Sequence, residues 1–507
     1  MTDRPRPVRD LDWSASEAAP LRDAAVDVWE RLISDITRLP IARDWAPGEV
    51  ASRVRLDVPR EPLPVEQLRA HLEDVAFETS VYPGHPRFMG YITGAGTVPG
   101  ALGDLVAAAL NQNVGGWRLS PAATEIEHHL TTWFARRFGL PASAGGIIVS
   151  GGSMANFTCL KVARDTRAEW DVRAMGVPAG PPLAIYASTE THAVVRRAAD
   201  ALGLGMDAVR CLPVDDVFRL RIEPLRAAIK ADRAAGIRPL AVVASAGTVA
   251  TGAIDPLEQI ADVCAREGVW FHVDASYGGP ACFTDELRPQ FAGIERADSI
   301  AFDPHKWMYT PHSGGCAVLR DFSLAKQSFH VDASYTVEDR ERTASTFDFG
   351  SHGMQWSRGF AALKIWLSLL AHGTDAYERR IAHDAELARY MGARVEARTN
   401  LELVTPVSLS ICCFRYVPSG LPLSGDAREH YLDELNARTM TEVQLDGRAY
   451  CSNAMIGERF VLRACIVNFR TEAEDVDALL DVVCEIGGRV DAAMRPRAAR
   501  LPVAVRG

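Results

Sequence analysis

The sequence predicts an α/β fold built on a mostly parallel sheet, and two patterns carry this prediction. Short β-rich runs alternate with helical runs between about residues 145 and 320, as they do where helices join parallel strands. The run "VWFHVDA" is almost continuously apolar, which is typical of a strand covered on both faces. The β-rich runs are "GGIIVS", "PLAIYAS", "PLAVVASAG", "GVWFHVDA", "DSIAFDP" and "GCAVLR".

One β-α-β unit within this region is clear enough to predict its helix ends. "PLAVVASAG" is expected to form a strand, "DPLEQIADVCAREG" a helix, and "VWFHVDA" the next strand. We expect Asp255 to cap the helix, Pro256 to take its first position and Gly268 to end it.

Helical patterns precede this region. Residues 17–37 and 64–78 repeat apolar side chains at three- and four-residue steps, and the proline-rich stretch 43–64 between them is expected to be extended. These segments contain little core of their own, so we expect them to pack on the main body or on another subunit.

The pattern changes again after residue 355. Residues 360–373 and 375–398 predict long helices, 401–417 and 458–469 predict strands, and 472–494 predicts a final helix. We therefore predict three parts: an N-terminal helical arm at 1–97, a large α/β domain at 98–375, and a smaller α+β domain at 376–507.

Composition excludes several classes of protein. A formal charge of −10 argues against a nucleic-acid binder, which needs clustered Lys and Arg. Nowhere does the chain reach the roughly 18 consecutive apolar residues that cross a bilayer, and its charged start lacks an apolar signal core, so we expect a cytoplasmic protein. The ten cysteines are scattered without metal-type spacing, which favours reduced thiols and no metal site.

Four features with chemical potential follow predicted strands. They are Lys306, Asp274, His192 and the Gly-Ser turn at 150–156. Each alone has an ordinary structural explanation, as a surface lysine, a turn acid, a structural histidine or a connecting turn. Ligands of open α/β sheets bind beyond the carboxyl ends of the strands, where such residues converge. A desolvated lysine that forms an imine, an acid beside a pyridine nitrogen, a ring-stacking histidine and a phosphate turn jointly fit pyridoxal 5′-phosphate.

The chain also resembles the group II pyridoxal-phosphate-dependent decarboxylases, the family of the aromatic-L-amino-acid, glutamate and cysteine-sulfinate decarboxylases. The resemblance rests on "HPRFMGYITGAGTVPG", "SPAATEIE", "SGGSMAN", "HVDASYGG", "DPHKW" and "RFVLRACIVNFRT", from about residue 20 to 490. It implies fold type I, the aspartate-aminotransferase fold, with a mostly parallel seven-stranded sheet. It further implies a homodimer with active sites at the subunit interface.

The resemblance also implies roles for individual residues. Lys306 would form the Schiff base, Asp274 would meet the pyridine nitrogen, and His192 would stack on the ring. The remaining cofactor contacts would come from Ser153, Met154, Ala155, Thr248, Asp303 and His305. Asp303 stands where the aromatic branch usually has Asn, which adds a negative charge near the phosphate. Substrate contacts are implied for Tyr91, Thr93, Gly94, Gly115 and Trp117.

The segment 334–359 departs from the family pattern. Related decarboxylases carry in such a loop a tyrosine that protonates the substrate carbon, and alignment of "SRGFAALKIW" puts Phe349 at its position, with Phe347 near the position used by the glutamate branch. Phenylalanine has no proton to give. One alternative is an aldehyde synthase, since a Tyr-to-Phe change here marks such enzymes in the family. Another is a decarboxylase whose proton comes from His192, Tyr335 or His352, and a third is that both phenylalanines only pack the loop.

Substrate choice is less readable. Gly115 and Gly116 indicate a roomy pocket, and Phe88, Met89, Tyr91 and Trp117 favour an aromatic or large apolar amino acid over glutamate. Arg358 would hold an acidic side chain or serve the structure. The main prediction is decarboxylation of an L-amino acid to its amine. An inactive cofactor-binding protein and an aminotransferase-like enzyme of another reaction type are the remaining alternatives.

Overall fold

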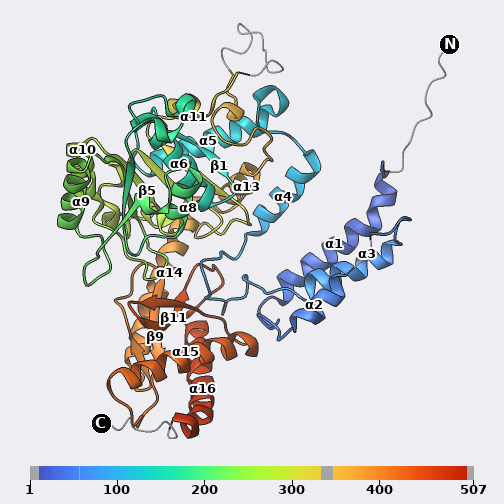
Figure 1. Ribbon diagram of the computed structural model, residues 1–507. Coiled ribbons are helices and arrows are strands. Elements are labelled where there is room, and N and C mark those ends of the chain that lie inside the picture. The colour runs from blue at the N-terminus through green and yellow to red at the C-terminus, as the bar shows by residue number, and fades with distance from the viewer. Residues whose placement is uncertain (1–10, 56–57, 333–345, 499–507) are drawn as a thin grey trace, which may run out of the picture.

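The computed structural model describes residues 11–55, 58–332 and 346–498. Within them the chain forms a large α/β body, a smaller body below it, and a helical arm that stands out to one side (Figure 1). Tyr335, one of the predicted proton donors, lies outside the described residues.

A seven-stranded sheet forms the centre of the large body, in the order β1-β7-β6-β5-β4-β2-β3. Only β7 runs against its neighbours β1 and β6, so the prediction of a mostly parallel seven-stranded sheet is confirmed. The four-residue edge strand β3 was not expected. The strands are β1 Gly145–Val149, β2 Leu183–Ser188, β3 Val209–Leu212, β4 Arg238–Ser245, β5 Trp270–Asp274, β6 Ser299–Phe302 and β7 Gly315–Leu319.

Helices cover this sheet and enclose one continuous apolar core. The central strands β2 and β5 are buried at every residue, as their unbroken apolar runs predict. The helices are α5 Pro121–Arg137, α6 Gly152–Arg167, α7 Val172–Met175, α8 Val194–Ala201, α9 Ile222–Ala234, α10 Leu257–Glu267, α11 Ser323–Phe329 and α13 Ala362–His372. Short 3₁₀ turns lie at Trp117–Leu119, Val177–Ala179, Met206–Ala208, Gly279–Phe283, Arg288–Phe291, Ile294–Arg296 and Phe349–Ser351.

The predicted start of α10 is wrong by one residue. Pro256 is the N-cap and makes no side-chain cap bond, so the helix begins at Leu257. The carboxylate of Asp255 is buried and accepts hydrogen bonds from the N–H groups of Ser245 and Leu220, both at 2.7 Å. Asp255 therefore ties loops together instead of capping the helix. Gly268 ends α10 with a φ of 63°, as expected.

The smaller body has an antiparallel sheet of order β10-β11-β9-β8 and its own apolar core. Its strands are β8 Leu401–Leu403, β9 Ile411–Tyr416, β10 Ser452–Ile456 and β11 Arg459–Cys465, and its helices are α14 Thr374–Glu396, α15 Gly425–Asp446 and α16 Ala473–Ala498. The α+β character expected after residue 355 is thus present, although α15 and β10 were not anticipated.

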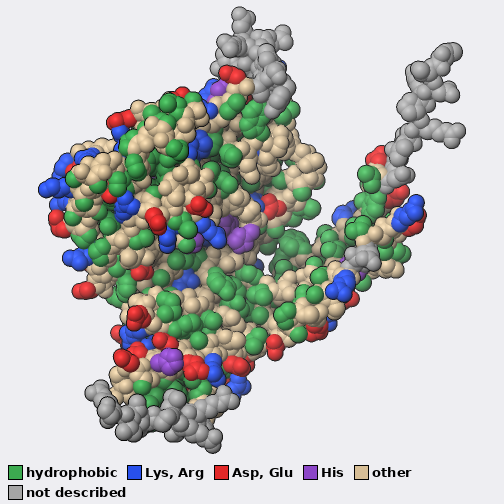
Figure 2. All heavy atoms as spheres, in the orientation of Figure 1, with side chains coloured by type: hydrophobic (Ala, Val, Ile, Leu, Met, Phe, Trp, Pro, Cys, Tyr) green, Lys and Arg blue, Asp and Glu red, His purple; other side chains and the backbone are tan. Residues whose placement is uncertain are grey.

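The N-terminal arm consists of α1 Ala15–Asp35, α2 Pro47–Val54, α3 Val65–His71 and the π-helical turn Leu72–Phe77. Both predicted helices are present, but α2 occupies the stretch that was expected to be extended, with Pro47 at its first position. A connecting segment leads from the arm to α4 Val98–Leu110, which packs on α13. Hydrophobic side chains continue along the arm and across its junction with the body (Figure 2).

Two further expectations concern the whole chain. All ten cysteines are free thiols, and most are buried, in agreement with the sequence prediction. In the part of the chain that the structure describes, none of the helices combines the length and apolarity needed to cross a bilayer.

Candidate active site

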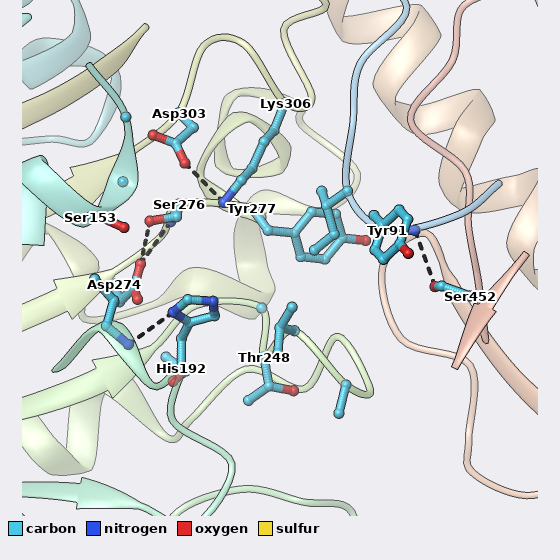
Figure 3. A pocket seen from close by; sticks show the side chains of 18 of the residues that line it. Tyr91, Ser153, His192, Thr248, Asp274, Ser276, Tyr277, Asp303, Lys306 and Ser452 are labelled. Atoms are coloured by element: carbon cyan, nitrogen blue, oxygen red, sulfur yellow. Dashed lines mark hydrogen bonds and ion pairs between the residues drawn. The ribbon is translucent and has the colours of Figure 1, made fainter. Parts of the chain in front are cut away.

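A cavity of about 720 Å³ opens at the carboxyl-terminal edge of the seven-stranded sheet. The parallel strands end at this edge, so residues that follow different strands meet there. The hairpin of β10 and β11 and the segment around Tyr91 close the cavity from the other side (Figure 3). Eight predicted site residues line it: Tyr91, Ser153, His192, Thr248, Asp274, Asp303, His305 and Lys306.

The amine of Lys306 enters the cavity from the turn that follows β6 (Figure 3). Its Nζ lies 2.8 Å from Oδ2 of Asp303, whose side chain is only 1% exposed. A carboxylate this deeply buried needs a counter-charge, and the lysine supplies it. The second oxygen, Oδ1, has no hydrogen-bond partner among the described residues.

Asp274 is the last residue of β5, and its carboxylate reaches the cavity. Its Oδ1 accepts hydrogen bonds from the backbone N–H of Ser276 at 3.1 Å and from the Ser276 hydroxyl at 2.6 Å. These two bonds fix the orientation of the carboxylate, because a side chain bonded twice at one oxygen cannot rotate freely.

His192 follows β2 and lies beside Asp274 in the cavity (Figure 3). Burial lowers the pKa of its imidazole, which the charge of Asp274 only partly offsets. The N–H of Val194 donates to its Nδ1 at 3.1 Å, so in the neutral ring the proton is carried by Nε2. His192 therefore offers the cavity an aromatic face and an Nε2–H donor.

The Gly-Ser turn between β1 and α6 forms one wall of the cavity through residues 150–153. The N-cap Gly151 has no side chain to satisfy the first N–H groups of α6, so these remain available to an anion. A Cβ at Gly152 would lie 2.6 Å from Oγ of Ser276, which explains the glycine. The side chain of Met154 is not in the lining, and the N–H of Ala155 is already bonded to the Gly151 carbonyl at 3.0 Å.

Thr248 and His305 complete the predicted cofactor contacts. The hydroxyl of Thr248 bonds to that of Thr251 at 2.9 Å and accepts from the N–H of Ala253 at 3.1 Å. The Nδ1 of His305 is 2.6 Å from the Gly314 carbonyl, and burial lowers the pKa of this imidazole. Both side chains are thus held by their own loops at the cavity wall.

Four predicted substrate residues do not line this cavity within one chain. Thr93 and Gly94 border a separate cavity of about 500 Å³ beside α1. Gly115 packs against the segment after Phe349, since a Cβ there would lie 2.2 Å from the Trp356 carbonyl. This packing accounts for the glycine, so Gly115 by itself gives no measure of pocket size. The N–H of Trp117 donates to Asp348 at 2.7 Å in the same region.

The predicted loop phenylalanines pack together in this structure. Phe349 is 0% exposed, and its ring lies under the guanidinium of Arg358 and against Phe347 at 4.8 Å between centroids. The ring of His352 lies against that of Phe347 in a tilted arrangement, with centroids 4.3 Å apart, and its Nδ1 donates to the Asp348 carbonyl at 2.8 Å. His352 does not line the cavity. Arg358 is buried and pairs with Glu127, which favours the structural role over the substrate-binding role.

Arg463 comes from β11 and lines the cavity, although it was not among the predicted site residues. Its Nη1 donates to the Tyr91 carbonyl at 3.3 Å and to the Ser452 hydroxyl at 3.2 Å. Its Nε and Nη2 are buried and have no partner among the described residues. An arginine inside the apolar run "RFVLRACIVNF" was the available signal, because a buried strand rarely contains an unneeded charge.

These groups fit a ligand that carries a phosphate, an aldehyde and a pyridine ring. Unpartnered buried polar atoms, here on Asp303 and Arg463, are rare unless a polar ligand or water meets them. The free N-terminus of α6 suits a phosphate, the Lys306 amine suits an aldehyde, and the fixed carboxylate of Asp274 suits a protonated ring nitrogen. The residues present therefore match pyridoxal phosphate, as the sequence predicts.

Comparison with known proteins shows the family to which the chain belongs. Residues 47–417 match the model of the pyridoxal-dependent decarboxylase conserved domain. An aromatic-L-amino-acid decarboxylase of Bacillus atrophaeus is 32% identical over 92% of this chain and 94% of its own. A phenylacetaldehyde synthase of a Rosa hybrid cultivar is 29% identical over 89% of each chain.

Solved structures are similar over almost the whole chain. The structure of Oryza sativa TDC with PLP and tryptamine has a TM-score of 0.87 at 28% identity, covering 95% of this chain and 99% of that one. Mouse CSAD has a TM-score of 0.88 at 29% identity, covering 93% and 98%. The chain therefore belongs to the pyridoxal-dependent decarboxylases, carboxy-lyases that act on amino acids with pyridoxal phosphate as cofactor.

Proposed function

We propose that this enzyme removes the carboxyl group of an aromatic or large apolar L-amino acid and releases the corresponding amine. The observation that carries the proposal is the meeting of the Lys306 amine, the Asp274 carboxylate and the His192 imidazole in one cavity. The named relatives that act on aromatic amino acids support the substrate class.

Each of these residues is proposed to hold one part of the cofactor. Lys306 would bind its aldehyde covalently through Nζ, and Asp274 would keep a proton on its ring nitrogen. His192 would stack on its ring, and the turn at 150–153 would bind its phosphate through the free N–H groups of α6. When bound, pyridoxal phosphate supplies an electron-poor ring that takes up the electron pair left as a bond at the substrate α-carbon breaks.

The chain's own residues would then orient the substrate and move its protons. Arg463 offers Nε–H and Nη2–H donors without partners, and the anionic group that every amino acid brings is its carboxylate. The His192 imidazole lines the cavity, and in its protonated form it would return a proton to the α-carbon through Nε2. The donating form is the protonated ring, which becomes the neutral ring as the proton moves, and burial, which lowers the pKa of His192, makes that protonated ring a stronger acid.

A second candidate function is oxidative: decarboxylation to an aldehyde. Phe349 takes the place of the family's loop tyrosine, and two similar proteins are aldehyde synthases, one from a Rosa hybrid cultivar and one from Rhodiola rosea. In that reaction the amino acid, dioxygen and water would give the aldehyde, carbon dioxide, ammonia and hydrogen peroxide. The His192 donor favours the amine, and the missing tyrosine favours the aldehyde.

One experiment separates these functions. Purified enzyme is given a panel of L-amino acids, and carbon dioxide, amine, aldehyde and peroxide are measured together. We expect carbon dioxide and amine in equal amounts from aromatic substrates, and no carbon dioxide from Lys306→Ala, which would also lose the visible absorbance of the bound cofactor. Equal amounts of aldehyde and peroxide would instead establish the oxidative route, and Phe349→Tyr should then shift product from aldehyde to amine. Turnover by Lys306→Ala would refute both.

We also propose that the enzyme forms a homodimer. We further propose that it resides in the cytoplasm, which is a reducing compartment. Two observations support a second copy of the chain. The N-terminal arm stands out from the body, and predicted substrate residues do not line the cavity of their own chain. The ten free cysteines support the reducing compartment, since secreted proteins usually pair theirs.

A further inference from the structure

A buried carboxylate lies beneath the turn that carries Lys306. Asp384 belongs to α14 and is 0% exposed. Its Oδ2 accepts hydrogen bonds from Nε1 of Trp307 at 3.0 Å and from the hydroxyl of Tyr309 at 2.7 Å. Its Oδ1 accepts from Nε of Arg380 at 2.8 Å. A fully buried acid thus binds the residues one and three places after the lysine.

The backbone of this turn needs such support. Tyr309 has a φ of 53°, in the left-handed region that a bulky side chain occupies only under constraint. Its carbonyl accepts from the N–H of Thr97 at 2.8 Å, and its own N–H donates to the Lys306 carbonyl at 3.2 Å. The Tyr309 hydroxyl bond to Asp384 is the side-chain anchor that opposes relaxation of this conformation.

The contacts around Asp384 also extend to the turn that follows Asp274. The ring of Trp307 stacks on that of Tyr277, with centroids 5.1 Å apart and planes 10° apart. Tyr277 lies three residues after Asp274, and its hydroxyl bonds to Oγ of Ser410 at 2.5 Å. One connected set of contacts therefore links the Lys306 turn, the Asp274 turn and the smaller body.

The charge of Asp384 is compensated inside this network. Burial raises the pKa of Asp384 to about 6, while Arg380 and the Tyr309 and Trp307 donors oppose the rise. The carboxylate is therefore ionised at neutral pH and pairs with Arg380 at 2.7 Å. Hydrogen bonds to an ionised acceptor are about twice as strong as neutral ones.

We propose that Asp384 is a positioning residue that fixes Trp307 and Tyr309 and thereby aims the Lys306 amine into the cavity. The inference rests on the proposed role of Lys306 in binding the cofactor. Asp384 does not touch the cavity and is not expected to take part in proton transfer. Its loss should misplace the amine by a fraction of a bond length or more, which is enough to weaken a reaction that depends on geometry.

The chain offers a matched control for the alternative that Asp384 only stabilises the fold. Asp491 in α16 is also buried, accepts from the Tyr431 hydroxyl at 2.7 Å, and accepts from Nε of Arg495 at 2.8 Å. A tyrosine hydroxyl and an arginine therefore also bind this aspartate of the smaller body, without the indole donor that Asp384 has, and Asp491 does not line the cavity. Asp384→Asn and Asp491→Asn remove equivalent charges.

The test compares both variants in three ways. Apoprotein is titrated with pyridoxal phosphate to give its Kd, the visible absorbance of the holoenzyme is followed against pH, and acylation of the Lys306 amine in apoprotein is followed by mass spectrometry. We expect Asp384→Asn to raise the Kd about tenfold or more, to shift the absorbance midpoint, and to change the acylation rate of Lys306. Asp491→Asn should leave all three within about twofold.

Two smaller changes keep the test valid if Asp384→Asn does not fold. Tyr309→Phe and Trp307→Phe each remove one donor to Asp384, and each is expected to give a part of the same shift. The inference would be overturned if every folded variant of Asp384, Tyr309 and Trp307 kept its Kd, absorbance midpoint and acylation rate within about twofold of those of the unmodified enzyme. Lys306→Ala separates this outcome from failure of the proposed function, because retained visible absorbance in that variant would refute the role of Lys306 itself.

Discussion

At the scale of single residues, the carboxylate of Asp303 is the most unusual feature of the site. It is buried beside the cavity and pairs with the Lys306 amine at 2.8 Å. The carboxylate thus engages the amine that is proposed to bind the cofactor aldehyde. The same negative charge lies near the turn proposed to bind the phosphate, where a Cβ at Gly152 would be 2.7 Å from Oδ2 of Asp303.

Asp303→Asn is therefore expected to strengthen cofactor binding. Removal of a buried negative charge near a phosphate and of the counter-charge of the amine should lower the Kd for pyridoxal phosphate about tenfold, or ~1.4 kcal/mol. The Kd is measured by absorbance titration of apoprotein at neutral pH. Asp285→Asn, which changes an exposed acid, is the control and should have no effect. Weaker binding by Asp303→Asn would show instead that the carboxylate helps to hold the cofactor.

Sequence reasoning could locate Lys306, Asp274 and His192 because each follows an apolar run that had to be a parallel strand. The ends of such strands converge whatever their distance in sequence. Arg463 was missed because it lies in the antiparallel sheet, more than a hundred residues after Lys306. No local sequence pattern predicts that this strand packs at the edge of the large sheet where the cavity opens. The packing of Gly115 against Trp356 was equally invisible, since only the folded chain brings these segments together.

At the scale of elements, His272 connects α6, the helix that follows the proposed phosphate-binding turn, to the large sheet. It lies in the middle of β5 and is fully buried. One ring nitrogen is 2.8 Å from Oγ of Ser299 in β6, and the other is 2.8 Å from Oδ1 of Asn156 in α6. The helix N-terminus and the strand that ends at Asp274 are therefore held in a fixed relation by one imidazole.

This contact predicts an acid sensitivity that can be assigned to one residue. Burial lowers the pKa of His272 from 6.5 to about 4. Between these values the unfolded chain binds a proton that the folded chain does not, so stability decreases as pH falls through this window. The full contribution is about 3 kcal/mol. The buried Asp255 and Asp384, whose pKa values are raised to about 6, act in the opposite sense, so the comparison is made between variants.

His272→Gln should remove this part of the pH dependence. Urea unfolding midpoints are measured from pH 4.5 to 7 for the unmodified enzyme, for His272→Gln and for His430→Gln, an exposed control. The slope of the free energy of unfolding against pH should differ from that of the unmodified enzyme by about one proton for His272→Gln, and should not differ for His430→Gln. Parallel curves for all three proteins would show that His272 is protonated in the folded state.

Most elements could be predicted, and those that could not share a physical reason. Six of the seven strands of the large sheet coincide with apolar runs of the sequence. The seventh, β3, has four residues at an edge and includes a half-buried arginine. The helix α2 begins at Pro47, in a proline-rich stretch that suggested extended chain, yet proline is well suited to the first turn of a helix. The short helix owes its existence to that position and not to an apolar stripe.

At the scale of the whole molecule, the division at residues 97 and 375 stays a prediction. The second boundary falls just inside α14, which begins at Thr374 and carries Asp384. Since Asp384 holds the Lys306 turn, the two bodies share the proposed active site. A boundary drawn from the sequence pattern cannot reveal this, because the contacts that cross it are made by side chains.

The arm predicts how many copies of the chain form the enzyme. Its own apolar cluster is small, centred on Ile36, Phe77 and Tyr82. The neighbouring helix α4 leaves Leu102, Leu105, Val106 and Leu110 between 43% and 63% exposed. Apolar surface of this extent on a monomer usually marks an interface. A second copy of the chain would cover this apolar surface. Its cavity would be the place where Gly115 and Trp117 contact substrate, because they do not line the cavity of their own chain.

Leu105→Asp is therefore expected to convert a dimer into a monomer of half the mass. A charge placed on a buried apolar interface costs several kcal/mol unless it finds a partner, so association should fail at micromolar concentration. Mass is measured by light scattering, and carbon dioxide release is measured on the same samples and should fall with the dimer. Met206→Asp, at an exposed apolar residue in the turn that precedes the edge strand β3, is the control. A monomeric and active unmodified enzyme would place the completed site within a single chain, and a Leu105→Asp variant that stays dimeric and active would assign the exposed face of α4 another partner.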